Sequence, residues 1–239
     1  MYTRKKILLN TSVKYILAAL ALLSIGSFVG CQESSDSLFE YTSDFKFTEG
    51  VYPDFESVLR NTPIPKGRII SEYSFSDNEF FTHVLGKKYV YYFDNLGNRI
   101  EFPTNKIWGY SRNGFLYIQV SRGFYRITML GSISHFLAYE TTEYYNNYNP
   151  YNTSPYYNTY TYSSPSRSSS TEMRQYLLDF KTGQLMDYTV QAVEVLLMYD
   201  PDLHTEYMQL SKRKKKQMKF LYIRKFNERN PLYLIKNNE

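Results

Sequence analysis

Short apolar runs separated by turn residues fill the middle of this chain, and they constrain its fold more than any other feature. The runs are rich in Tyr, Phe, Ile and Val and are short for helices, which is typical of β-strands. Asn113-Gly114 and Arg122-Gly123 stand between neighbouring runs, where glycine permits the positive φ of a tight hairpin. We therefore predict an antiparallel meander of about eight strands. The predicted strands are 68–75, 80–85, 88–93, 99–102, 116–120, 124–129, 133–139 and 175–180.

The last third of the chain changes to a helical period. Thr189 is a suitable N-cap for a helix that carries apolar residues over 190–199. Asp200-Pro201 is typical of an N-cap followed by a first helical residue, so a second helix is expected from there to Asn227, ending before Pro231. A meander followed by two C-terminal helices makes an α+β domain.

The N-terminus carries the pattern of an exported lipoprotein. Cationic residues at 4–6 precede an apolar run over 15–30, which has the length of a signal-peptide core and is short for a spanning helix. The run ends in Phe28-Val29-Gly30-Cys31, which resembles the bacterial lipobox, although Phe28 stands where an aliphatic residue is usual. Cys31 is the only cysteine. We expect cleavage before Cys31 and a diacylglycerol on its thiol. The alternatives are a secretory signal beside a stray cysteine and an uncleaved anchor.

This pattern divides the chain into a signal peptide (1–30), a flexible polar tether (31–45) and one folded domain (46–239). The mature chain would hold 24 basic and 23 acidic side chains, and this near-neutral balance argues against a nucleic-acid partner. The charge is uneven, because residues 31–200 sum to −5 and residues 201–239 to +6. The basic tail is either a solvated helix face or a patch that meets anionic lipid or an acidic partner.

A Tyr- and Asn-rich segment interrupts the strands. Residues 144–162 hold eight Tyr, five Asn and two Pro without a formal charge. We expect a disordered insertion over 141–171, formed by a hairpin loop that low-complexity sequence has lengthened. The alternatives are an adhesive or glycan-contacting loop, since tyrosine offers a stacking face and a hydroxyl, and a segment for self-association.

No local motif indicates nucleophilic catalysis or a metal site. The three histidines, His83, His135 and His204, are scattered, and no thiol remains to join them after lipidation. Ser132 and Ser134 precede His135 without the Gly-x-Ser-x-Gly turn of a serine hydrolase. We therefore expect no metal and no serine triad.

Paired carboxylates and cofactor motifs are equally unsupported. Asp77 and Glu79 would share one face of a strand, yet they adjoin a predicted turn and are expected to be solvated. The chain has no phosphate loop and no dinucleotide fingerprint, so no cofactor is expected. The sequence favours a non-enzymatic protein and leaves open a hydrolase that lacks a local signature.

Aromatic residues around a predicted hairpin are the candidates for ligand contact. Trp108 and Tyr110, together with Tyr117, would gather on one face of the sheet. An exposed aromatic strip of this kind binds carbohydrate or peptide, and packing in the core is the alternative interpretation.

Several short segments across the mature chain share the pattern of one family. They are Gly50-Val51-Tyr52, Phe55-Glu56-Ser57, Asn61-Thr62-Pro63, Ile107-Trp108-Gly109-Tyr110, Leu116-Tyr117-Ile118, Phe124-Tyr125-Arg126, Gly131-Ser132-Ile133, Leu178-Asp179-Phe180, Thr182-Gly183 and Phe226-Asn227-Glu228-Arg229-Asn230-Pro231. Together they resemble an uncharacterised group of Bacteroidota lipoprotein-like proteins of unknown function, with the Tyr-rich segment as an insertion. The resemblance implies a bacterial envelope setting and supplies no site residues.

We therefore expect a lipid-anchored protein of a Gram-negative cell envelope with a binding or assembly role. Its partners would be the membrane, through the lipid, and an envelope protein or glycan. Outer-membrane attachment is favoured, because Gln32-Glu33 lacks the aspartate that retains many enterobacterial lipoproteins at the inner membrane. A glycan-binding accessory lipoprotein that uses Trp108, Tyr110 and the Tyr-rich segment is the second hypothesis. An envelope hydrolase is the third.

Overall fold

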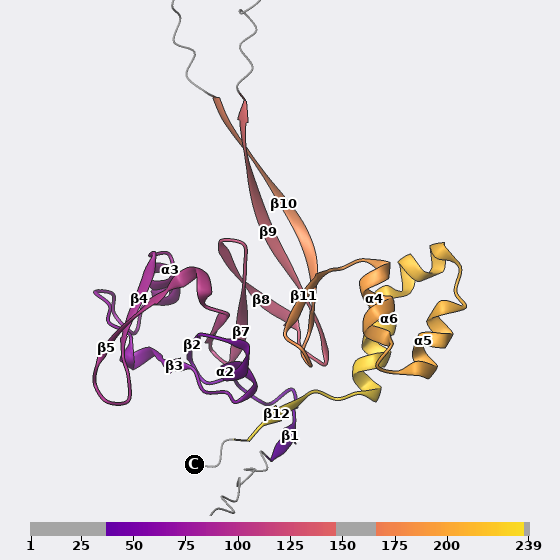
Figure 1. Ribbon diagram of the computed structural model, residues 1–239, viewed down its shortest axis with the longest axis horizontal. Coiled ribbons are helices and arrows are strands. Elements are labelled where there is room, and N and C mark those ends of the chain that lie inside the picture. The colour runs from indigo at the N-terminus through magenta and orange to yellow at the C-terminus, as the bar shows by residue number, and fades with distance from the viewer. Residues whose placement is uncertain (1–36, 147–165, 237–239) are drawn as a thin grey trace, which may run out of the picture. The chain divides into compact units, whose positions relative to one another are not determined.

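The computed structural model describes residues 37–146 and 166–236, so Cys31, the predicted signal peptide and residues 147–165 lie outside the described residues. Within them, eight strands form one antiparallel sheet in the order β11-β10-β9-β8-β7-β6-β2-β3 (Figure 1). The predicted α+β class is confirmed, and β6 to β11 follow one another as a meander. The sheet strands are β2 (Gly50–Tyr52), β3 (Ile64–Pro65), β6 (Gly109–Arg112), β7 (Phe115–Val120), β8 (Gly123–Met129), β9 (Ile133–Asn146), β10 (Ser166–Asp179) and β11 (Gln184–Asp187).

Two smaller strand pairs and five α-helices complete the described part of the chain. The pairs are β1 (Leu38–Glu40) with β12 (Tyr233–Ile235), and β4 (Tyr89–Phe93) with β5 (Arg99–Pro103). The helices are α2 (Phe55–Leu59), α3 (Phe80–Leu85), α4 (Val190–Leu197), α5 (Pro201–Met208) and α6 (Lys212–Arg229), with short 3-10 turns at Lys66–Arg68 and Thr104–Lys106. Among these, no helix has both the length and the apolar character needed to cross a membrane.

Alternation along the strands buries side chains on both faces of the sheet. One face carries Tyr52, Ile118 and Phe136, which pack with α2 and with the segments around β1 and β12. Two separate groups of elements pack against the other face of the sheet. At one end Val51 and Tyr110 pack with α3 and β4, and at the other end residues of β9 and β10 pack with α4, α5 and α6. All buried side chains of these three clusters follow residue 46, so a chain that begins at Gln32 keeps the whole described core.

The strand predicted over 80–85 is wrong, because this segment is the helix α3. Phe80, Phe81, Val84 and Leu85 are buried, which is the one-sided spacing of a helix. Asp77 and Glu79 therefore do not share a strand face. They lie in the turn that precedes α3, where Asp77 Oδ1 accepts from the Glu79 backbone N–H at 2.8 Å.

The segment 68–75 is also not a strand. It follows a 3-10 turn, and Ile69 makes only an isolated bridge to Tyr92. The strands predicted over 88–93 and 99–102 exist as β4 and β5, but they pair with each other outside the main sheet. Four of the eight predicted strands are therefore absent from the main sheet, which contains β2, β3, β6 and β11 instead. Of these, β2 pairs with β6, which lies far along the chain.

The C-terminal region contains three described helices where two were predicted. Thr189 and Asp200 cap α4 and α5 as expected, since their side chains accept from the backbone N–H groups of Ala192 and Leu203. The second predicted helix is interrupted, however, because Ser211 is a further N-cap whose side chain accepts from Lys214 N–H.

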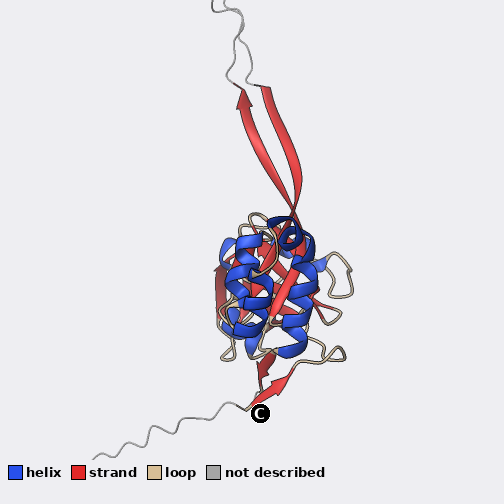
Figure 2. Ribbon diagram, turned by 90° about the vertical axis from the view of Figure 1, so that its right-hand side faces the viewer, coloured by secondary structure: helices blue, strands red, loops and turns tan. Residues whose placement is uncertain are grey.

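The hairpin of β9 and β10 extends beyond the other strands of the sheet (Figure 2). The two strands pair from Ile133↔Asp179 to Asn146↔Ser166, whereas β11 pairs only from Tyr176 onward along β10. Parts of the predicted disordered insertion, residues 141–146 and 166–171, are thus paired strands.

Candidate functional site

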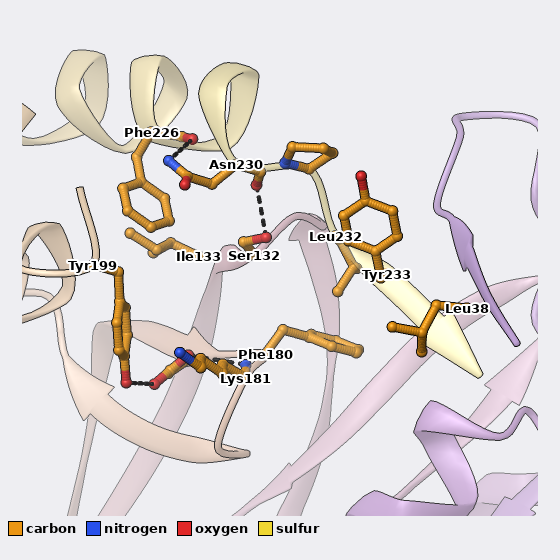
Figure 3. A pocket seen from close by; sticks show the side chains of 12 residues that line it. Leu38, Ser132, Ile133, Phe180, Lys181, Tyr199, Phe226, Asn230, Leu232 and Tyr233 are labelled. Atoms are coloured by element: carbon orange, nitrogen blue, oxygen red, sulfur yellow. Dashed lines mark hydrogen bonds between the residues drawn. The ribbon is translucent and has the colours of Figure 1, made fainter. Parts of the chain in front are cut away.

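A cavity of about 450 Å³ lies between the sheet and the segment that follows α6 (Figure 3). Its walls come from β1, the start of β9, the turn after β10, the loop between α4 and α5, and residues 226–233. A volume of this size holds a small molecule or one apolar chain. Most of the wall is apolar, and these residues are Leu38, Ile133, Phe180, Phe226, Pro231, Leu232 and Tyr233.

Asp179, the last residue of β10, is a buried acid at this cavity and only 4 % exposed. Its Oδ1 accepts from the Lys181 backbone N–H at 2.9 Å, and its Oδ2 accepts from the Thr182 hydroxyl at 2.8 Å. The Tyr199 hydroxyl donates to the same Oδ2 at 3.2 Å. The negative charge of Asp179 raises the pKa of the Tyr199 hydroxyl, because ionised tyrosine would bring two anions together. Both carboxylate oxygens of Asp179 therefore accept hydrogen bonds within the protein, which stabilise the turn before β11 and hold the Tyr199 side chain in place.

Ser132 is also engaged within the protein. Its hydroxyl donates to the backbone carbonyl of Asn230 at 2.7 Å. The Asn230 side-chain amide in turn donates to the Phe226 carbonyl at 3.1 Å and to Asp200 Oδ2 at 3.3 Å. These bonds fix the chain where it leaves α6 and turns across the start of β9. Ser132 thus acts as a structural donor, and no described base stands ready to activate it as a nucleophile.

Lys181 is the single cation among the residues that line the cavity. Its Nζ lies 4.5 Å from the ring centre of Tyr199, which is a cation–π contact. The side chain is exposed and forms no ion pair with an acid in the described part of the chain. The cavity therefore joins apolar walls to one available ammonium group, which suits a ligand with an apolar body and an anionic group.

The three aromatic residues predicted to contact a ligand do not form one strip. Tyr110 and Tyr117 stand opposite each other on β6 and β7, and their rings stack at 4.6 Å. Phe81 stacks on Tyr110 at 4.8 Å as well, so both faces of this ring are covered and Tyr110 is only 7 % exposed. Trp108 packs instead with Phe55, at 5.7 Å, against the cluster on the opposite face of the sheet.

The histidines lie apart in the structure. His83 is 3.7 Å from Asp77, and His135 Nε2 lies 3.1 Å from the side-chain oxygen of Gln175. His204 Nε2 is buried and has no described hydrogen-bond partner. Across the described ranges, no group of three or more His, Cys, Asp or Glu side chains has the arrangement of a metal site. The described hydrogen-bond partner of His135 is thus the side-chain amide of Gln175 and not a carboxylate.

Comparison with known proteins finds no match to a family model, to a curated protein or to a solved structure.

The residues of the cavity were not identified from the sequence as site residues. Asp179 lies in the strand predicted over 175–180, Lys181 and Thr182 follow that strand, and Tyr199 lies in the helix predicted over 190–199. The signal that could have found them is Asp179 followed by Thr182 and Gly183. An aspartate whose side chain accepts from the residues two and three positions later is typical of a tight turn, and such a turn fixes the acid.

Proposed function

We propose that this chain is a lipid-anchored cell-envelope protein that binds a ligand or partner and does not catalyse a reaction. It is attached through a diacylglycerol on Cys31, in the outer membrane of a Gram-negative bacterium. The lipobox-like residues 28–31 support the anchor. The observation that carries the binding role is the cavity beside Asp179, where the walls are apolar and the acid, Ser132 and Tyr199 are already hydrogen-bonded within the protein.

The ligand that this cavity suits is an amphipathic anion. An apolar body gains free energy by leaving water for walls such as Ile133, Phe180 and Phe226. A carboxylate or sulfate at its end would lie near Lys181, whose ammonium group is exposed at the rim. Proton transfer is not favoured here because the acid and the hydroxyls already have partners.

The binding role is tested with the fluorescent anion anilinonaphthalene sulfonate, displaced by dodecanoate. Leu38 is 62 % exposed at the cavity wall, so Leu38→Trp narrows the site without entering the core. We expect this variant to weaken dodecanoate by at least about tenfold. Lys181→Gln should weaken dodecanoate by up to about fivefold and leave neutral dodecanol unchanged, because an exposed ion pair contributes at most about 1 kcal/mol.

Lys106→Gln is the matched control, since Lys106 is exposed and lies outside this cavity. If Leu38→Trp binds dodecanoate as tightly as the wild-type protein, the cavity is not the binding site.

The anchor is tested in cells by the mass of the N-terminal peptide and by partition into detergent. We expect a lipid-modified peptide that begins at Cys31, and a Cys31→Ser variant that remains in the aqueous phase. A mature chain that begins at another residue, or carries no lipid, would contradict the proposed attachment.

The glycan hypothesis has less support from the geometry. A sugar stacks on an open ring face, yet Phe81 and Tyr117 cover Tyr110, and Trp108 is half-buried against Phe55 on the other side of the sheet.

A further inference from the structure

The first half of α6 carries exposed cations that lack an acidic partner. Lys212, Arg213, Lys214 and Lys216 are exposed, and none forms an ion pair with an acid in the described residues. Lys215 is the exception in this run, because it is buried and its Nζ lies 2.7 Å from Glu194. The excess positive charge of the C-terminal region is therefore concentrated on exposed side chains in the first one to two turns of α6.

The second half of the helix is different, since its cations have partners. Lys225 pairs with Glu206 at 2.9 Å, and Arg229 pairs with Asp200 at 2.9 Å. Charge at this end is balanced within the protein. The unbalanced charge thus belongs to one end of α6 and is not a general property of the helix.

Apolar side chains lie on the same outward face as these cations. Met218 is 38 % and Leu221 45 % exposed, and they follow the basic run by two and five residues. Phe220 is 43 % exposed, but its ring packs against His135 of β9 at 5.8 Å. Met218 lies four residues after Lys214, and Leu221 lies three residues after Met218, so these three side chains follow one another along one side of the helix, away from its buried side. A cationic helix face with exposed apolar side chains between its charges is typical of a helix that lies in a membrane interface.

We infer that the outward face of α6 (Arg213, Lys214, Lys216, Met218 and Leu221) contacts an anionic phospholipid surface. The cations meet the headgroups and the apolar side chains enter the boundary of the acyl chains. The first turn of α6 contains no acid, and its cations face the positive end of the helix dipole, so a negative surface relieves repulsion that the fold retains.

The position of β1 supports a membrane occupant over an acidic protein. β1 pairs with β12, which follows the C-terminal end of α6, so the first described residues lie beyond that end of the helix. The cations lie at the opposite end of the helix, about 20 Å away at 1.5 Å per residue. A lipid tether near one end and a basic face at the other would lay α6 along the bilayer. This orientation rests on the proposed anchor, whereas the lipid affinity of the face does not.

The test uses residues 32–239, which lack Cys31 and keep the described core, with folding confirmed by circular dichroism. Partition is measured by cosedimentation with phosphatidylcholine vesicles, with and without about 30 % phosphatidylglycerol. We expect preference for the anionic vesicles that is lost between about 0.1 M and about 1 M salt, as the screening length falls from about 10 to about 3 Å. The triple variant Arg213→Gln, Lys214→Gln, Lys216→Gln should bind on the order of 100-fold more weakly, at about fivefold for each charge.

The matched control removes the same charge elsewhere, with Lys88→Gln, Lys106→Gln and Arg122→Gln. These residues are exposed, and they line a different cavity between β4, β5 and the turn after β7. We expect this control to bind like the wild-type chain. A second variant, Met218→Ser with Leu221→Ser, should reduce partition at both low and high salt, because it removes the exposed apolar side chains of the face.

Three results would overturn the inference. Equal loss in both triple variants would assign binding to net charge. Equal binding to neutral and anionic vesicles would remove the role of the cations. The third result combines two measurements. If the wild-type chain does not bind vesicles, and the α6 triple variant no longer crosslinks in cells to an envelope protein that the wild-type chain does crosslink, the face would be assigned to an acidic protein. Because the tested chain carries no lipid, none of these outcomes decides whether Cys31 is the anchor.

Discussion

Asn227 attaches α6 to the sheet in place of a neighbouring strand, and its removal should be costly. Its Nδ2 donates to the Ile133 carbonyl at 2.8 Å, and its Oδ1 accepts from the Ile133 backbone N–H at 2.8 Å. Ile133 is 1 % exposed, so water has little access to either group. Each buried group left without a partner costs about 1–3 kcal/mol. We expect Asn227→Ala to lower the free energy of unfolding by about 2–4 kcal/mol, since the smaller side chain admits some water.

The assay is urea unfolding, followed by circular dichroism and by the emission of Trp108. The midpoint should fall with an unchanged slope, and the melting temperature should drop by about 5–15 °C for a chain of this size. Asn227→Asp should lose at least as much, because it keeps the acceptor but places an oxygen against the Ile133 carbonyl. Asn105→Ala is the control, since Asn105 is exposed, and should change stability by less than about 0.5 kcal/mol. A loss below about 1 kcal/mol for Asn227→Ala would refute the reasoning.

Three further predictions concern other parts of the described core. Gly109→Ala should unfold the protein or make it insoluble, because an added Cβ would lie 2.2 Å from the Tyr117 carbonyl oxygen. Gly67→Ala is the control, because a Cβ at this position would have no atom within 4 Å, and it should leave the urea midpoint unchanged. Tyr52→Phe should cost about 1 kcal/mol in that assay, since the single proton of the buried hydroxyl is shared between Asn61 Oδ1 at 2.7 Å and the Thr48 carbonyl at 2.9 Å; an unchanged midpoint would contradict this. Burial lowers the pKa of His135, so the neutral ring is favoured in the folded state and stability should decline as the pH falls below about 6.5. His135→Gln should flatten this decline between urea midpoints taken at neutral and mildly acidic pH, and an unaltered slope would count against the assignment.

The sequence predicted best the strands whose neighbours in the sheet are also their neighbours in the chain. β7, β8 and the start of β9 follow one another through short turns, and Asn113 and Gly114 adopt the positive φ that the Asn-Gly pair suggests. β2 is a three-residue strand that pairs with β6 far along the chain. No local pattern distinguishes such a segment from a loop, because its stability comes from a distant partner.

The misassigned segment 80–85 shows how two sequence signals compete. Its Phe and Val residues favour a strand by composition, while the apolar pairs Phe80-Phe81 and Val84-Leu85 are four residues apart, as in a helix. Tertiary packing selected the helix, since both pairs are buried against Val51 and Ile107. Periodicity was the more informative signal here.

The candidate site was less predictable than the fold. Lys181 and Tyr199 are separated by a strand and a helix, and their contact depends on how α4 packs on β10. In contrast, the pairing of Tyr110 with Tyr117 follows from the hairpin turn at Asn113-Gly114, although the stacking by Phe81 that buries Tyr110 required the fold.

The pair of β1 and β12 gives the protein a defined response to mechanical load. A pull on the chain before Ser37 first meets Leu38↔Ile235 and the bond from Lys236 N–H to the Ser37 carbonyl. Because the strands are antiparallel and the force enters at this end, the bonds open one after another instead of sharing the load. β1 belongs to no other sheet, so peeling it leaves the eight-stranded sheet paired. If the chain is anchored at Cys31 as proposed, a load that peels β1 from β12 would add the residues of β1 to the link before the eight-stranded sheet opened.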